Sequence, residues 1–137
     1  MQWFGYAVVD DSLWIRVSQP KELESGITLS FIIDGFRTDV PFAKMPSILA
    51  YIENNKFYIF NATEDRYIYP EGASLEIYQD SVIFKIPLDA LGDPQGLLLG
   101  PNTNATYMPE GVTAFRIIKI EDDQSGIGQV GNAEEKL

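Results

Sequence analysis

The sequence predicts an all-β protein, folded as an antiparallel two-sheet β-sandwich with one short helical turn. Three observations point to this fold class. Apolar residues recur with a period of two along most of the chain, which is typical of strands with one buried face. Short polar turns separate these segments, and no window has the periodicity of a long amphipathic helix. A chain of 137 residues, of which 45% are hydrophobic, suits a single domain.

The first hairpin is expected near the start of the chain. Residues 4–9 and 13–17 alternate on either side of a polar turn at 10–12. Trp14 lies in the middle of the second strand, and we expect this large aromatic side chain to face the opposite sheet and lie in the core. The 4–9 strand is expected at a sheet edge, where unpaired backbone groups favour self-association.

The remaining strands follow the same pattern. They are expected at 27–33, 48–53, 56–60, 74–78, 82–86, 97–99 and 113–120. The second and third of these form a hairpin that turns on Asn54-Asn55, since asparagine tolerates the positive φ that tight turns require. Residues 35–46 are predicted to be an ordered loop, because Phe42, Met45 and two prolines are too apolar to be left in water.

The helical turn is expected at 88–91. Pro87 ends the preceding strand and presets the helical φ. Leu88 and Leu91 then pack one turn over the open end of the sandwich, and Gly92 leaves it with positive φ.

The composition changes at residue 121. The last segment contains three glycines, five acids and one lysine, with few large apolar residues. We therefore expect the sandwich domain to span 1–120 and residues 121–137 to form a flexible acidic, glycine-rich tail or linker.

Composition also excludes several chemistries. The chain has neither cysteine nor histidine, which removes disulfides, thiolate chemistry, zinc hydrolysis and histidine-based triads. The formal net charge of −10 repels phosphate backbones and anionic lipids, so nucleic acid is not an expected partner. The apolar runs are too short for membrane insertion, and the first residues lack the pattern of a signal peptide.

One segment carries more than a general β pattern. Residues 82–92, VIFKIPLDALG, resemble the late strand and following turn of the DOMON-like, or family-9 carbohydrate-binding-module-like, β-sandwich superfamily. The opening hairpin and the 48–60 hairpin are similar to segments of the same group in the same order. The resemblance implies an immunoglobulin- or jelly-roll-like sandwich. It also implies one of three roles, which are sugar binding, a structural or adhesive role, and b-type haem binding.

Sugar binding requires an exposed aromatic platform flanked by polar groups, because a pyranose presents an apolar face and a rim of hydroxyls. Tyr67 and Tyr69 share a strand face and are the best platform candidates, although edge packing and solubility are the more common reason for such residues. The full set of candidate ligand-binding residues is Trp3, Arg66, Tyr67, Tyr69, Asn102 and Asn104.

The carboxylates favour turns over catalysis. Asp10 and Asp11 are adjacent turn residues without the apolar flank that raises a carboxyl pKa for acid chemistry, so we expect no enzyme. A structural calcium ion held by Asp34 and Asp39 is the metal alternative, although their spacing matches no calcium-loop pattern.

Haem is the cofactor alternative. Without histidine, an axial ligand would come from methionine, lysine or tyrosine. Met45 loosely resembles a ligand-bearing position of haem-binding relatives, and Met108 is a second loop methionine. A methionine in an apolar loop more often fills a packing gap.

Together these observations favour a non-catalytic, extracellular or cell-surface binding module of a larger protein, with a polysaccharide or sugar as ligand. Two glycosylation sequons, at Asn61 and Asn104, suit that location. The first alternative is a structural surface-layer, pilus or interaction domain that self-associates through edge strands. The second is a b-type haem domain that transfers electrons.

Overall fold

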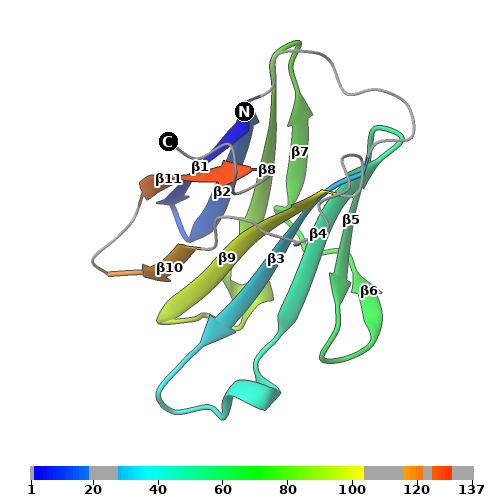
Figure 1. Cartoon of the computed structure of the whole chain (residues 1–137). Helices are drawn as coiled ribbons and strands as arrows, with labels where there is room; N and C mark the ends of the chain where they lie inside the picture. The colour runs from blue at the N-terminus through cyan, green and yellow to red at the C-terminus, as the bar shows by residue number, and fades with distance from the viewer. Residues whose placement is uncertain (1, 19–27, 104–115, 122–124, 131–137) are drawn as a thin grey trace.

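The computed structural model describes residues 2–18, 28–103, 116–121 and 125–130. These residues form two antiparallel sheets that pack face to face as a sandwich, which confirms the predicted fold class (Figure 1). Two short 3-10 turns, η1 (Phe42–Lys44) and η2 (Leu88–Leu91), accompany the strands. No helix within the described ranges is long and apolar enough to cross a membrane.

The first sheet has five strands in the order β11-β1-β2-β8-β7. They are β1 (Gln2–Val9), β2 (Ser12–Ser18), β7 (Ser74–Ile77), β8 (Ser81–Pro87) and β11 (Ser125–Val130). The second sheet has six strands in the order β10-β9-β3-β4-β5-β6. They are β3 (Thr28–Phe36), β4 (Ser47–Glu53), β5 (Lys56–Asn61), β6 (Arg66–Ile68), β9 (Gly96–Thr103) and β10 (Arg116–Lys119).

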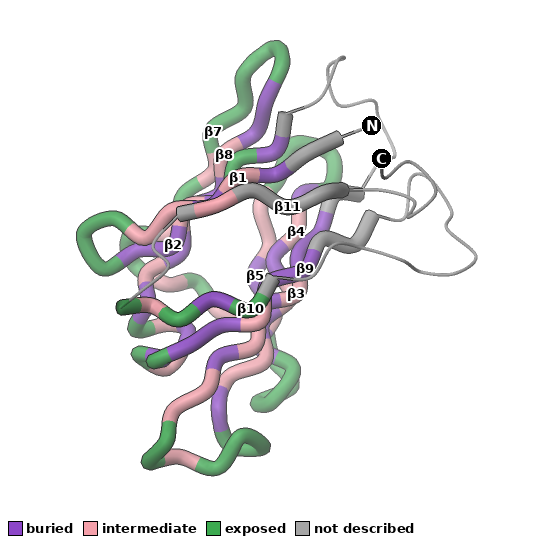
Figure 2. The backbone as a smooth tube through the Cα atoms, turned by 60° about the vertical axis from the view of Figure 1, so that its left-hand side comes forward, coloured by how far each residue is buried: buried purple, intermediate pink, exposed green. Residues whose placement is uncertain are grey.

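The core lies between the sheets and follows the period-two pattern of the sequence. Along each central strand buried residues alternate with more exposed ones, as the colouring of Figure 2 shows. Three phenylalanines from both sheets meet edge to face in the middle. The ring centroid of Phe31 lies 5.3 Å from that of Phe4 and 5.7 Å from that of Phe84. Such pairs add to the stabilisation that burial alone provides.

The turn chemistry matches the sequence. Asp10 and Asp11 have φ values of 50° and 62°, and Asn54 and Asn55 have 52° and 64°. Both hairpins thus turn on two residues in the left-handed region, which short-side-chain Asp and Asn adopt with little strain. At η2 the predicted elements are also confirmed, since Leu88 and Leu91 are buried and Gly92 has a φ of 85°.

The predicted ordered loop at 35–46 is confirmed as well, with one exception. Gly35 and Phe36 extend β3, Arg37 bridges to Val40, and η1 follows. Met45 is 4% exposed, whereas Phe42 stays 61% exposed. The burial argument was therefore right for the methionine and wrong for the phenylalanine.

The expectation for residues 121–137 is corrected in part. Ser125–Val130 form β11, which pairs with β1 from Gln2↔Val130 to Ala7↔Ser125. Because β1 also pairs with β2, it lies inside its sheet, so the expectation of 4–9 as an exposed edge was wrong. Glycine-rich β11 has few apolar side chains of its own, and it is held by this backbone pairing with β1.

Trp14 is a further correction. Leu13, Ile15 and Val17 of β2 are fully buried, and alternation places Trp14 and Arg16 on the opposite, outer face of the five-stranded sheet. Trp14 is half-buried there rather than in the core.

Candidate functional site

Four aromatic residues on the outer face of the six-stranded sheet form the largest ring cluster outside the core among the residues that the structure describes. They are Tyr51, Tyr58, Phe60 and Tyr67, here called the tyrosine platform. Ile48, Ala50 and Ile52 of β4 are buried, so Tyr51 between them points outward. The β4–β5 register then sets Tyr51 opposite Tyr58, and the β5–β6 register sets Phe60 opposite Tyr67.

The platform rings contact one another directly. Tyr51 and Tyr58 stack with centroids 5.0 Å apart and planes inclined by 23°. Tyr67 stands edge-on to Phe60 at 5.0 Å and to Tyr58 at 6.2 Å. Cross-strand aromatic pairs of this kind stabilise a sheet, so the platform is preorganised before any ligand arrives.

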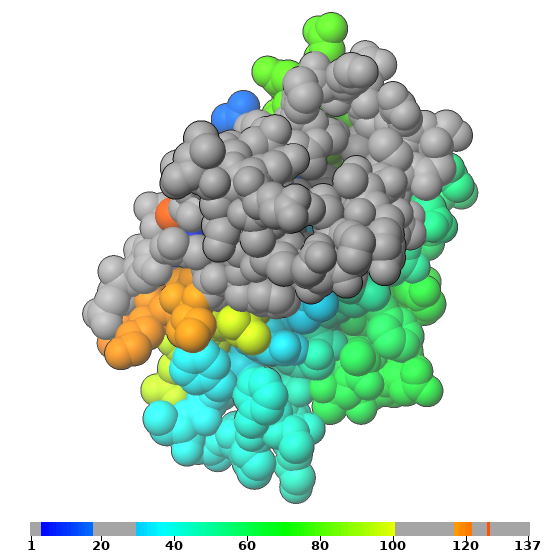
Figure 3. Space-filling view, viewed as in Figure 1, coloured from blue at the N-terminus to red at the C-terminus, as the bar shows by residue number. Residues whose placement is uncertain are grey.

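Hydroxyl groups rim the platform. The hydroxyls of Tyr51 and Tyr67 lie 2.8 Å apart and share a hydrogen bond. Burial, followed by this hydrogen bond, raises the pKa of Tyr51 above its ordinary value, so its hydroxyl stays protonated and can donate. Tyr67 is 44% exposed, and Tyr69, which follows β6, is 84% exposed. The predicted pair Tyr67 and Tyr69 thus offers accessible ring surface. The part of the molecule around β6 lies at the lower right of Figure 3.

The remaining predicted ligand-binding residues are not gathered at the platform. Arg66 pairs with Glu64, with 2.8 Å between Nε and Oε1, and alternation turns it away from the face of Tyr67. The backbone of Trp3 pairs with Ser18 in the other sheet. The backbone of Asn102 in β9 pairs with Ser30 of β3, and two strands, β3 and β4, separate β9 from β5. The side chains of Trp3 and Asn102, and all of Asn104, lie outside the described residues.

The two aspartates proposed for calcium have separate partners. Both oxygens of Asp39 accept hydrogen bonds from Arg37, at 2.7 and 2.8 Å, and this contact lowers the pKa of Asp39. Asp34 accepts a hydrogen bond from Ser47 Oγ at 2.5 Å. No group of three acidic side chains suited to a metal occurs in the part of the chain that the structure describes. Asp34 and Asp39 are not assembled into one ligand set.

The proposed haem ligand Met45 acts in packing. Its Cε would lie 3.4 Å from a Cβ added at Gly35 and 3.0 Å from one added at Gly92, so the thioether fills the space above two glycines. Met108 lies outside the described ranges.

The side chains of the Asn61 sequon form hydrogen bonds within the fold. Asn61 is 4% exposed, and its Oδ1 accepts a hydrogen bond from the backbone N–H of Glu64 at 3.1 Å. Thr63 Oγ1 donates to the Met45 carbonyl and accepts from the Ser47 N–H. Both ends of the sequon therefore stabilise a turn, and the Asn61 side chain is buried in the folded protein.

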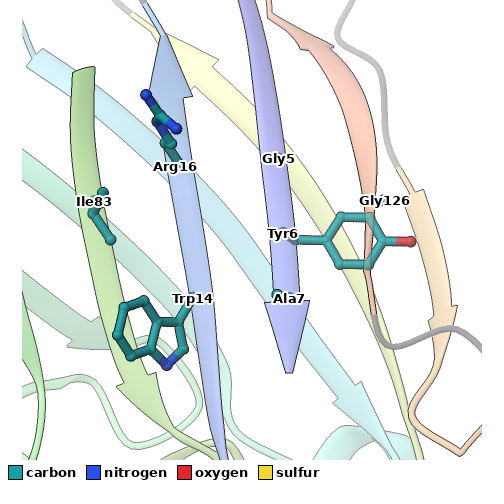
Figure 4. Close-up of a pocket in the computed structure, with 7 residues that line it drawn as sticks. All are labelled: Gly5, Tyr6, Ala7, Trp14, Arg16, Ile83 and Gly126. Atoms are coloured by element: carbon teal, nitrogen blue, oxygen red, sulfur yellow. The ribbon is translucent and has the colours of Figure 1, made fainter. Parts of the chain in front are cut away.

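A groove that the sequence did not predict lies on the outer face of the five-stranded sheet. Its volume is about 510 Å³ (Figure 4). It is lined by Gly5, Tyr6 and Ala7 of β1 and by Gly126 of β11, while Trp14, Arg16 and Ile83 flank it. Alternation could have located it, because Trp14 stands between buried Leu13 and Ile15 and must face outward. The small residues opposite it leave the surface hollow.

The groove carries positive charge. Lys85 places its ammonium 5.3 Å from the centre of the Trp14 ring, a cation–π contact. Arg16, next but one to Trp14 on the same face, has no ion pair or hydrogen bond with the described residues. The Trp14 Nε1–H is buried and lacks an acceptor there.

Comparisons of the chain with protein-family models, with curated proteins and with solved structures give no match. The class that fold and geometry define is therefore a β-sandwich whose two outer faces differ, one bearing an aromatic platform and the other a groove.

Proposed function

We propose that the protein is a non-catalytic, extracellular or cell-surface carbohydrate-binding module of the sandwich type, and that the tyrosine platform is its sugar-binding surface. The observation that carries this proposal is the set of mutually packed rings ending in exposed Tyr67 and Tyr69. A pyranose stacks its apolar face on such rings and hydrogen-bonds its hydroxyls to the tyrosine rim.

Three further features support the proposal. The rings are fixed by cross-strand packing, so little side-chain entropy is lost when a sugar binds. The carboxylates at the platform side belong to turns or ion pairs, as Glu64 does, which suits binding without hydrolysis. The similarity of residues 82–92 to the carbohydrate-binding sandwich superfamily adds to this, although that resemblance argues for fold before function.

Affinity electrophoresis in gels containing neutral polysaccharides, such as β-glucan, xylan and mannan, tests the proposal. We expect retardation by at least one of them, and we expect Tyr67→Ala to weaken it about tenfold by removing a stacking surface. Tyr78→Ala is the matched control, because Tyr78 is also half-exposed but follows β7 of the other sheet. Migration unaffected by every polysaccharide would refute the proposed function.

A structural or interaction domain is the second candidate, and one observation favours it. Ile117 on β10, at the end of the six-stranded order, is 71% exposed beside β9. An edge strand that exposes an apolar side chain can pair with a second copy of the chain. Light scattering over a wide concentration range checks it. Self-association that Ile117→Lys abolishes would favour this role, and a constant monomer mass would eliminate it.

A further inference from the structure

The groove over β1 follows from small residues at outward positions. Phe4 and Tyr6 point into the core, so Gly5 and Ala7 point out, and neither fills the space above the strand. A Cβ added at Gly5 would come no closer than 3.6 Å to its nearest neighbour, the Gly126 carbonyl oxygen. The floor therefore has room for a methyl group at this position without strain.

The groove combines an apolar lining with a single flanking guanidinium. Figure 4 shows Trp14 and Arg16 projecting from β2 and Ile83 from β8. A small inorganic anion would leave the Trp14 and Ile83 surfaces in water, so the lining fits a ligand with an apolar face. A volume of about 510 Å³ is in the range of small-ligand sites and holds one or two sugar rings.

The local charge runs against that of the chain. The protein has a net charge of −10, yet Arg16 and Lys85 both face this side, and neither has an ion pair with the described residues. Glu76, across β8 from Arg16, accepts a hydrogen bond from the Tyr78 hydroxyl at 3.2 Å. A planar guanidinium donates two parallel, charge-assisted hydrogen bonds to the two oxygens of a carboxylate. A neutral ligand has no such pair of charged acceptor oxygens.

We propose that this groove binds a sugar ring bearing a carboxylate, namely a hexuronic acid residue of an acidic polysaccharide. The ring lies over Gly5 and Ala7 against Trp14, and its carboxylate pairs with Arg16, with Lys85 adding a second positive charge. The inference goes beyond the proposed function, because the groove lies on the opposite sheet from the tyrosine platform and would stand if the platform bound no sugar.

The orphaned indole N–H fits this proposal. Trp14 Nε1 is buried without an acceptor among the described side chains and backbone, a state that costs free energy in the unliganded protein. A bound sugar that draws the indole toward the groove supplies an oxygen acceptor. Binding is therefore expected to shift the tryptophan emission.

Isothermal titration calorimetry with trigalacturonate, and separately with its methyl ester, tests the proposal on the full chain. The ester keeps the same sugar rings and linkages but has no carboxylate to pair with a guanidinium. We expect the acid to bind at least tenfold more tightly than the ester, with an affinity that falls as salt screens the ion pair. Equal affinities for acid and ester, or no binding of the acid, would overturn the proposal.

Two variants locate the site. Arg16→Gln is expected to weaken binding of the acid at least tenfold, and Gly5→Leu is expected to abolish it by filling the floor. Phe42→Ala, at an exposed residue of η1 that belongs to neither the groove nor the tyrosine platform, should leave it unchanged. Thermal melting confirms that each variant is folded. An Arg16→Gln protein that melts normally and binds the acid as tightly as the original would rule the site out.

Discussion

The two outer faces of this sandwich obey the same alternation and have opposite characters. On the six-stranded sheet the outward positions of β4, β5 and β6 carry rings that pack on one another. On the five-stranded sheet the outward positions of β1 carry Gly5 and Ala7, and the surface is hollow. Period two decides which residues point out, but the size of those residues decides whether a face becomes a platform or a groove.

Each sheet also contains a glycine beneath an aromatic ring on the neighbouring strand. In the five-stranded sheet Tyr6 pairs with Gly126, and its ring extends across β11 (Figure 4). In the six-stranded sheet Phe36 pairs with Gly96. Rings that cover strand glycines protect the backbone and pin the register. The two pairs differ in burial, since Tyr6 is 4% exposed and Phe36 is half-buried.

The largest effect is therefore expected at Gly126. A Cβ added there would lie 2.6 Å from Tyr6 Cζ, and the Tyr6 side chain is only 4% exposed. We expect Gly126→Ala to lower the free energy of unfolding by about 1–3 kcal/mol, as overpacking does, measured by urea denaturation. Gly5→Ala is the control and should stay within about 0.5 kcal/mol of the original protein. Equal losses in the two variants would contradict the pairing of β11 with β1.

At Gly96 the same contact should cost less. A Cβ there would meet the Phe36 ring even more closely, with Cζ nearest and Cε1 at 2.7 Å, but this ring is half-buried and can turn toward solvent. We expect Gly96→Ala to lower the free energy of unfolding by about 1 kcal/mol. In a double-mutant cycle, Phe36→Leu should recover part of that loss, because it removes the ring that the new methyl group meets. Strictly additive effects of the two substitutions would count against direct contact.

These glycine pairs show where sequence reasoning succeeds and where it ends. The hairpins at 10–11 and 54–55 were predictable because Asp and Asn pairs adopt positive φ locally. Strand β11 was missed because its stability comes from β1 and from the Tyr6 ring, both more than a hundred residues away in the chain. A glycine-rich segment has no local signature for such pairing.

The candidate sites divide in the same way. Tyr67 was a candidate because it shares a strand face with Tyr69, and the predicted turn at Asn54-Asn55 already sets Tyr51 opposite Tyr58. The contact of Tyr67 with these rings depends on the β5–β6 register, which one sequence does not specify. Trp14 was assigned to the core on its size, although the buried Leu13 and Ile15 beside it require the opposite face. Strand parity was a better guide than hydrophobicity at this position.

A smaller effect is expected at the platform hydroxyls. Tyr51→Phe removes the 2.8 Å hydrogen bond to Tyr67 and should lower the free energy of unfolding at neutral pH by about 0.5–1 kcal/mol. The pKa of Tyr51 is raised in the folded protein, so its protonated hydroxyl contributes to the free energy of unfolding. This contribution is fully present below about pH 10, the ordinary pKa of tyrosine, and is lost as the pH rises above that value. Urea denaturation at neutral pH and above about pH 10 should show a shallower alkaline decline in Tyr51→Phe than in the original protein. A steeper decline would contradict the assigned direction.

The smallest effect is expected at Lys85. It tests whether a cation–π contact stabilises Trp14 on the groove face, as ring stacking stabilises the tyrosine platform. The Lys85 ammonium lies 5.3 Å from the Trp14 ring centre at the protein surface, where cation–π contacts contribute about 0.5 kcal/mol. Lys85→Met keeps most of the alkyl packing and removes the charge, so it should lower the free energy of unfolding by that amount, while Lys85→Arg should preserve it. The same charge change alters the field around the indole and should shift its emission. If Lys85→Met left both stability and emission unchanged, the Lys85–Trp14 contact would contribute no free energy. The two faces would then differ in shape but not in the forces that hold their aromatic side chains.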